Sequence, residues 1–258
     1  MQTQTSPYLP VFNTIGFVLV LVMNYLATSL PLAGRDTGEI SDLYPNLFAP
    51  AGFTFAIWGI IYLLLLLFII YQIRYTGKKE QPVFFEKIGW LFFISCLANA
   101  TWLLAWHHLK IGLALIIMLI ILGSLLSIYL RLNIGKSETT KIEKWLVHFP
   151  FSVYLGWITV ATIANTTIFL VSLGWNGQPL NAVFWTIATI AAAVGINLWA
   201  LFSRKDFAFA LVGIWALWGI FQKRMSDLSM NDGSVEIVTL IGIALIAIGI
   251  LYTLIKRK

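Results

Sequence analysis

The chain carries little charge. Charged residues make up only 11% of its 258 residues, while hydrophobic residues make up 59%. A soluble domain carries roughly 25% charged residues, because its surface must face water. A chain this apolar would expose large hydrophobic patches in water. The composition therefore excludes a soluble globular protein.

Charge is missing above all from the long apolar stretches. No Asp, Glu, Lys or Arg lies deep in any of them. Pumps that couple transport to protons or ions usually need an ionisable group within the membrane. The sequence therefore disfavours an ion-coupled pump.

Patterns for catalysis and metal binding are also missing. Cys96 is the only cysteine, so no disulfide forms within the chain, and its place in an apolar stretch predicts a packing role. His107 and His108 fall on the opposite side of the expected bilayer from His148, ~30 Å away, and cannot share a metal with it. There are no paired carboxylates, no Ser–His–Asp set, no phosphate loop and no zinc-ligand spacing. We predict no catalytic residues, no metal site and no enzyme activity.

The chain does contain eight apolar runs. Most are about 20 residues long, the length that spans a bilayer core of ~30 Å as a helix. Strands are not expected, because an open sheet edge cannot sit in lipid. The fold class predicted is all-α, a polytopic transmembrane helix bundle of eight helices. The runs are Val11–Leu30, Gly52–Ile73, Ile88–Trp106, Ile111–Leu130, Trp145–Leu173, Asn181–Phe202, Phe207–Phe221 and Val235–Leu254.

The distribution of Lys and Arg predicts the orientation. With eight spans, thirteen of the seventeen basic residues lie on the side that holds both termini. Basic loops stay in the cytoplasm, so both termini are expected there, in the plasma (inner) membrane. If the short run Phe207–Phe221 does not span, the tail lies outside. The formal charge of +6 is then a topology signal and attracts anionic lipid, and no nucleic-acid partner is expected.

Uncharged polar and aromatic residues remain inside the runs. Asn24, Asn99, Asn165 and Asn197 could join helices by hydrogen bonds or face a ligand. The eleven Trp residues exceed what interfacial belts use. Indoles on facing helices could line a cavity for a flat apolar ligand.

Three motifs carry a family resemblance. One run contains Pro50 followed by Trp58 and Tyr62, the next contains Asn99 and Trp102, and a third reads Tyr154-Leu-Gly-Trp157 with Asn165 eight residues after the tryptophan. In order and spacing these motifs resemble the TspO/translocator protein family of tryptophan-rich sensory proteins over residues 1–173.

The chain also departs from that family. The family's Pro-Pro pair is Pro50-Ala51 here, and the proline expected before Tyr154 stands at Pro150. The family ends after five helices, whereas this chain continues. We therefore predict two parts, a TspO-like five-helix transmembrane module at 1–173 and three additional transmembrane helices at 174–258.

The resemblance implies a small-molecule site between the helices. In the family, tetrapyrroles, sterol-like lipids and drug-like molecules bind beneath the long first loop. This loop is 31–50 here, and we expect it to contain no helix. The resemblance thus implies that no cofactor is required and that a porphyrin or haem-like molecule is one possible ligand. It implies membrane lipid and a small apolar ligand as partners, and it leaves open whether the protein forms a homodimer. Carried over by position, the implied ligand-binding residues are Trp58, Tyr62, Asn99, Trp102, Trp157, Ala161 and Asn165.

Several functions fit these features. The first is a ligand-binding, sensory, regulatory or carrier protein of the TspO type. The alternative is a multi-helix transporter or permease for a small apolar solute, which should show internal repeats that this sequence lacks. A porphyrin-modifying enzyme is a third option.

Overall fold

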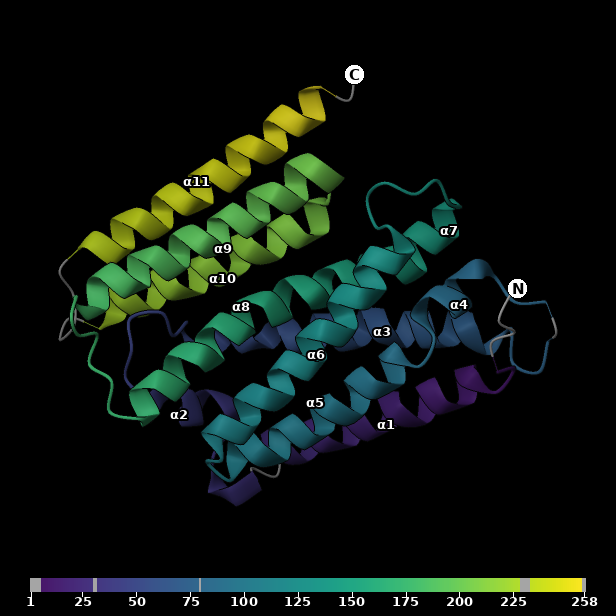
Figure 1. Ribbon diagram of the computed structural model, residues 1–258, viewed down its shortest axis with the longest axis horizontal. Coiled ribbons are helices and arrows are strands. Elements are labelled where there is room, and N and C mark those ends of the chain that lie inside the picture. The colour runs from purple at the N-terminus through teal and green to yellow at the C-terminus, as the bar shows by residue number, and fades with distance from the viewer. Residues whose placement is uncertain (1–5, 30–31, 79, 228–232, 257–258) are drawn as a thin grey trace. The chain divides into compact units, whose positions relative to one another are not determined.

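The computed structural model describes residues 6–29, 32–78, 80–227 and 233–256, and within these ranges it contains helices and no strands (Figure 1). Each of the eight apolar runs corresponds to a long helix over its described residues; Leu30, at the end of the first run, lies outside these residues, and the third run is interrupted at Gly89 and Trp90. Six helical segments have the length and apolar composition of a membrane span: Leu9–Thr28, Gly52–Ile73, Ile111–Leu132, Lys141–Ser172, Ala182–Arg204 and Ser234–Ile255. The fold class predicted from the sequence is confirmed.

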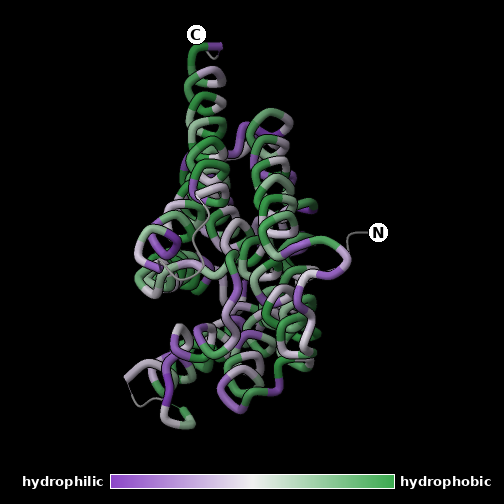
Figure 2. Tube along the Cα trace, turned by 90° about the vertical axis from the view of Figure 1, so that its left-hand side faces the viewer, coloured by the Kyte–Doolittle hydropathy of each residue, from purple (hydrophilic) through white to green (hydrophobic). Residues whose placement is uncertain are grey.

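The two remaining runs differ from these six. Helix α5 (Leu91–His107) is apolar but has 17 residues. Helix α10 (Phe207–Ser226) has 20 residues and ends in a turn that carries Lys223 and Arg224. Hydrophobic residues fill the long helices, and hydrophilic residues gather in the connections between them (Figure 2).

The chain divides into two compact units. The first comprises residues 1–36 and 58–155, and the second comprises residues 37–57 and 156–258. The first unit contains helices α1 (Leu9–Thr28), α4 (Val83–Ile88), α5, α6 (Ile111–Leu132) and α7 (Lys141–Glu143), most of α3 (Ile57–Ile73) and the start of α8 (Phe149–Ser172). The second contains α2 (Thr37–Asp42), the rest of α8, α9 (Ala182–Arg204), α10 and α11 (Ser234–Ile255).

Aromatic packing and one amide pair hold the first unit. Helix α5 packs against both α1 and α6. The Phe68 ring on α3 meets those of Phe92 and Phe151 edge-on, with centroids 5.3 and 5.1 Å apart. On α1, Asn13 donates a 3.0 Å hydrogen bond to the side chain of Gln72 on α3, and both are buried. Polar groups buried in lipid need such partners.

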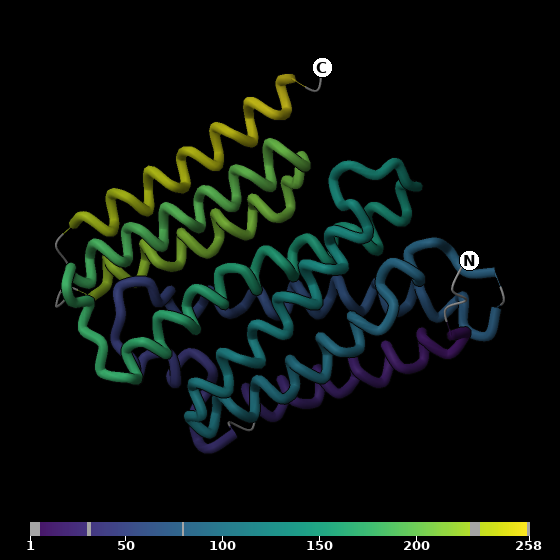
Figure 3. The backbone as a smooth tube through the Cα atoms, viewed as in Figure 1, coloured from purple at the N-terminus to yellow at the C-terminus, as the bar shows by residue number. Residues whose placement is uncertain are grey.

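The second unit is built on close helix contacts. Helices α9, α10 and α11 lie side by side and contact one another (Figure 3). At Gly242 of α11, an added Cβ would lie 2.7 Å from Val194 of α9. Only glycine allows the backbones to approach this closely, as small residues do in membrane helix pairs.

The first long loop differs from the sequence expectation. It was expected to lack a helix, but its described residues include the short helix α2 and a 3-10 turn at Leu32–Gly34. The loop ends in a second 3-10 segment, Gly52–Ala56, which leads directly into α3. The sequence did not predict this short helix, because α2 consists mainly of polar and small residues and lacks the long apolar run that identifies a membrane span.

Candidate ligand-binding pocket

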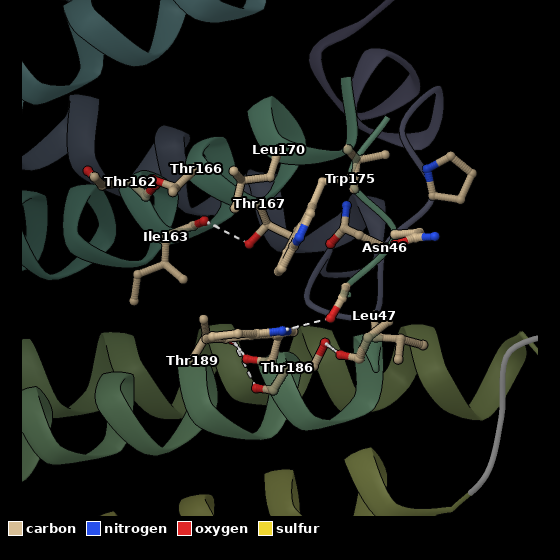
Figure 4. A pocket seen from close by; sticks show the side chains of 16 residues that line it. Asn46, Leu47, Thr162, Ile163, Thr166, Thr167, Leu170, Trp175, Thr186 and Thr189 are labelled. Atoms are coloured by element: carbon tan, nitrogen blue, oxygen red, sulfur yellow. Dashed lines mark hydrogen bonds between the residues drawn. The ribbon is translucent and has the colours of Figure 1, made fainter. Parts of the chain in front are cut away.

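The second unit contains a cavity of about 490 Å³ between α8 and α9. Sixteen residues line it, from the loop 45–47, the C-terminal half of α8, the connection 175–177 and the first turns of α9 (Figure 4). Its size lies within the ~300–1,000 Å³ typical of sites for small molecules. We call this cavity the α8–α9 pocket.

Two tryptophans fix the connection at one end of the pocket. The Trp185 indole N–H donates to the carbonyl oxygen of Gly177 at 3.0 Å, and the Trp175 N–H donates to that of Gln178 at 3.1 Å. Their rings lie 5.6 Å apart, tilted by 59°. Gly177 has φ of 92°, and a Cβ there would lie 2.8 Å from the Ala182 nitrogen, so the turn requires glycine.

The other loop at the pocket is held by an asparagine. The Asn46 side-chain oxygen accepts hydrogen bonds from the backbone nitrogens of Phe48 and Ala49, at 3.1 and 2.8 Å, and its amide donates to the carbonyl oxygen of Tyr44. These bonds fold the loop on itself. Pro45, Asn46 and Leu47 therefore reach the pocket as an ordered segment.

Downstream, the same loop is tied to α10. The Ala51 nitrogen donates to the carbonyl oxygen of Gly219 at 3.0 Å, and the Trp215 indole N–H donates to that of Thr54 at 2.9 Å. Gly219 packs directly on Thr54, leaving no room for a Cβ. Helix α10 thereby anchors the segment that carries one wall of the pocket.

Threonines dominate the helix walls. In Figure 4, Thr162, Thr166 and Thr167 come from α8, and Thr186 and Thr189 come from α9. Each hydroxyl donates to the carbonyl oxygen four residues earlier in its own helix. The distances are 2.7 Å for Thr162, 2.8 Å for Thr166, 3.1 Å for Thr167, 2.8 Å for Thr186 and 3.0 Å for Thr189, whose hydroxyl also lies 2.9 Å from the carbonyl oxygen of Thr186.

The pocket is uncharged. None of its sixteen lining residues, all within the described part of the chain, is Asp, Glu, Lys, Arg or His. No three His, Cys, Asp or Glu side chains among the described residues are grouped so that they could hold a metal ion. The pocket can therefore hold a ligand by apolar contact and neutral hydrogen bonds.

Four of the seven residues predicted from the sequence lie in the first unit. The Trp58 and Tyr62 rings stack at 5.5 Å, and Trp58 also meets Tyr154 edge-on at 6.0 Å. The Asn99 amide donates to the Tyr154 hydroxyl at 3.1 Å. Trp102, one turn further along α5, stacks on Trp106 at 5.4 Å.

The Tyr62 hydroxyl is buried next to the amides of Asn24 and Asn99, although it makes no hydrogen bond of good geometry there. The structure thus brings Trp58, Tyr62 and Asn99 together in one aromatic and amide cluster of the first unit.

The other three predicted residues lie on α8 in the second unit. The Trp157 ring is edge-on to that of Phe55, with centroids 6.0 Å apart. Asn165 donates to the carbonyl oxygen of Ala161 at 3.1 Å. None of the seven predicted residues lines the α8–α9 pocket, and their contact with a ligand stays a prediction.

Sequence analysis missed the pocket residues. Trp175 and Trp185 lie near the ends of the predicted runs, where an interfacial anchor is the usual interpretation of a tryptophan. The threonines of α8 and α9 occur singly or in pairs, as in many membrane helices. Their concentration near the end of one run and the start of the next was the available signal.

A second, charged cavity lies at the end of α10. Its volume is about 190 Å³, and Asp42, Lys223, Arg224 and Asp227 are among the residues that line it. Lys223 pairs with Asp42 at 2.9 Å, and Arg224 with Asp227 at 3.8 Å. Arg224 is 2% exposed, and the charge of buried Glu236 also acts on it. The carboxylates compensate the cations here, so we interpret this cluster as structural.

Comparison with known families is decisive for the identity of the chain. The family model described as TSPO-like protein matches residues 10–252. The chain belongs to the TSPO-like protein family. The match extends over the three C-terminal helices, so α9, α10 and most of α11 lie within the TSPO-like region. Comparisons with curated proteins and with solved structures give no match.

Together, the TSPO-like family match and the six candidate spans identify an integral membrane protein. The division at residue 173, the plasma membrane and the cytoplasmic termini stay predictions.

Proposed function

We propose that this TSPO-like protein binds a small, largely apolar molecule in the α8–α9 pocket, in a sensory, regulatory or carrier role and without catalysing a reaction. The observation that carries the proposal is the uncharged cavity of about 490 Å³ bordered by two indoles and two ordered loops. Apolar walls with a few placed polar groups are the usual form of such sites.

The surrounding structure supports this function. Hydrogen bonds within the protein, made by the side chains of Trp185 and Asn46, hold the two loops. A preformed site avoids the entropy that ordering its loops on binding would cost. The family of the chain supports the same class of ligand, since small apolar molecules are what the TspO resemblance implies.

Native mass spectrometry of the purified protein tests the proposal. The variant Thr167→Phe places a ring in the cavity, whereas Thr101→Phe places the same ring on an exposed face of α5, outside the pocket. We expect a small molecule to co-purify with the wild type and with Thr101→Phe, and to be lost from Thr167→Phe. Equal occupancy of all three proteins would contradict the proposal.

A further inference from the structure

The hydrogen-bond inventory of the α8–α9 pocket indicates the class of ligand that it accepts. Each wall threonine uses its single hydroxyl hydrogen within its own helix. A hydroxyl has one donor and two acceptor lone pairs. What these side chains present to the cavity are therefore oxygen lone pairs.

The other polar side chains of the pocket follow the same pattern. The indole N–H groups of Trp175 and Trp185 are used by backbone carbonyls, and so is one of the two amide hydrogens of Asn46. Asn176 is the exception, but it is exposed. Away from the helix ends, backbone N–H groups are used by the helices themselves. Beyond the first turn of α9, where the backbone N–H of Ala182 lacks an intrahelical partner, the helix walls thus accept hydrogen bonds and scarcely donate them.

Such walls discriminate between ligands. A hydroxyl or N–H group on a ligand finds acceptors, whereas a carboxylate finds no cation among the lining residues and no free side-chain donor on α8 or α9. Moving a carboxylate out of water without a partner is costly.

From this we infer that the α8–α9 pocket selects a neutral apolar molecule bearing a hydrogen-bond donor, such as a hydroxyl or N–H, and rejects carboxylates. The inference rests on the proposed function, because it concerns the ligand of the same pocket. It also separates this pocket from a site for porphyrins, whose carboxylates would find no cation among the lining residues. The chain of a membrane lipid would fill the space without using the acceptors.

Three matched probes test the inference: 1-pyrenemethanol, its methyl ether and 1-pyrenecarboxylate. They share one flat ring system and differ in whether they donate, only accept or carry negative charge. Energy transfer from the tryptophans to pyrene reports binding to the purified full-length protein. We expect the alcohol to bind roughly 2- to 10-fold more tightly than the ether, the ratio that one hydrogen bond provides. The carboxylate should bind at least about tenfold more weakly than the alcohol.

Isosteric variants assign the preference to the walls. Thr167→Val and Thr186→Val keep the volume of the side chain but remove its hydroxyl oxygen, the hydrogen-bond acceptor. The ratio of the affinity for the alcohol to that for the ether should therefore fall toward one. Thr101→Val is the matched control, because Thr101 makes the same intrahelical bond, 2.8 Å to Leu97, outside the pocket. Each probe partitions into detergent equally for all variants, so comparing variants removes that contribution. If Thr186→Val does not fold, Thr189→Val replaces it.

The outcomes are distinguishable. Equal binding of alcohol and ether, as a lipid-chain site would give, or tighter binding of the carboxylate, overturns the inference on ligand class and leaves the binding function standing. A ratio that persists unchanged in the valine variants also overturns it. Saturable binding of none of the three probes overturns the proposed function, and the inference falls with it.

Discussion

The indole nitrogen of Trp185 lies 3.0 Å from the carbonyl oxygen of Gly177, a bond that ties the first turn of α9 to the connection that borders the pocket. Because Trp185 itself lines the cavity, one side chain both shapes the site and fixes its border. The pocket thus depends on a hydrogen bond as well as on apolar packing.

Trp185→Phe tests this dependence. The ring keeps most of the apolar surface but loses the N–H donor, so the connection around Gly177 should become less ordered. We expect 1-pyrenemethanol to bind about 2- to 10-fold more weakly, as measured by titration. Trp199→Phe is the control, since Trp199 lies on the same helix, is 54% exposed and does not line the pocket. Equal effects of the two variants would show that the bond does not matter.

Asn99→Leu tests the aromatic and amide cluster of the first unit. The variant removes the 3.1 Å bond to Tyr154 and should lower the stability of the protein by about 0.6–2 kcal/mol, seen as a lower Tm in detergent. We expect the affinity for 1-pyrenemethanol to stay unchanged, because Asn99 does not line the pocket. A selective loss of affinity without a change in Tm would instead favour the ligand site predicted from the sequence.

Glu236→Gln tests the charged cluster at the end of α10. Glu236 is 6% exposed and its charge acts on buried Arg224, so the variant leaves a buried cation less compensated. We expect a loss of stability of about 1–3 kcal/mol, measured as a fall in Tm. Glu138→Gln, at an exposed position, should leave Tm unchanged. No difference between the two variants would mean that Arg224 does not need this carboxylate.

Cysteine labelling tests the orientation predicted from the basic residues. Cys96 is buried, so a new cysteine provides the accessible thiol. Ser137→Cys and Lys256→Cys should react only when reagent reaches the cytoplasm, and Glu39→Cys should react from outside. Labelling of Lys256→Cys from outside would mean that one run fails to span, and α10 would be the first to re-examine.

Apolar run length was enough to predict the long helices. The run predicted at Ile111–Leu130 became the helix Ile111–Leu132, and Asn181–Phe202 became Ala182–Arg204. Such long apolar runs leave few alternatives in a membrane. Helix α2 escaped prediction because its six residues, Thr37–Asp42, contain a single large apolar side chain.

The pocket could not be predicted in the same way. Its lining combines residues near 46, 166 and 186, and no sequence motif indicates that these three segments lie together in the fold. Trp185 had the position of an interfacial anchor, yet its N–H is used by Gly177. Thr186 had the pattern of an ordinary helix threonine. Tertiary contacts, which one sequence does not display, give these residues their role.

Occupation of the α8–α9 pocket is the central claim, and a titration of three proteins with 1-pyrenemethanol tests it most directly. Thr189 lines the cavity, so Thr189→Phe should fill part of it, while Thr101→Phe adds the same ring outside. Tryptophan-to-pyrene energy transfer should saturate with the same affinity in the wild type and in Thr101→Phe, and be weakened about tenfold or more in Thr189→Phe, a change of about 1.4 kcal/mol or more. Identical titrations for all three proteins would contradict the account.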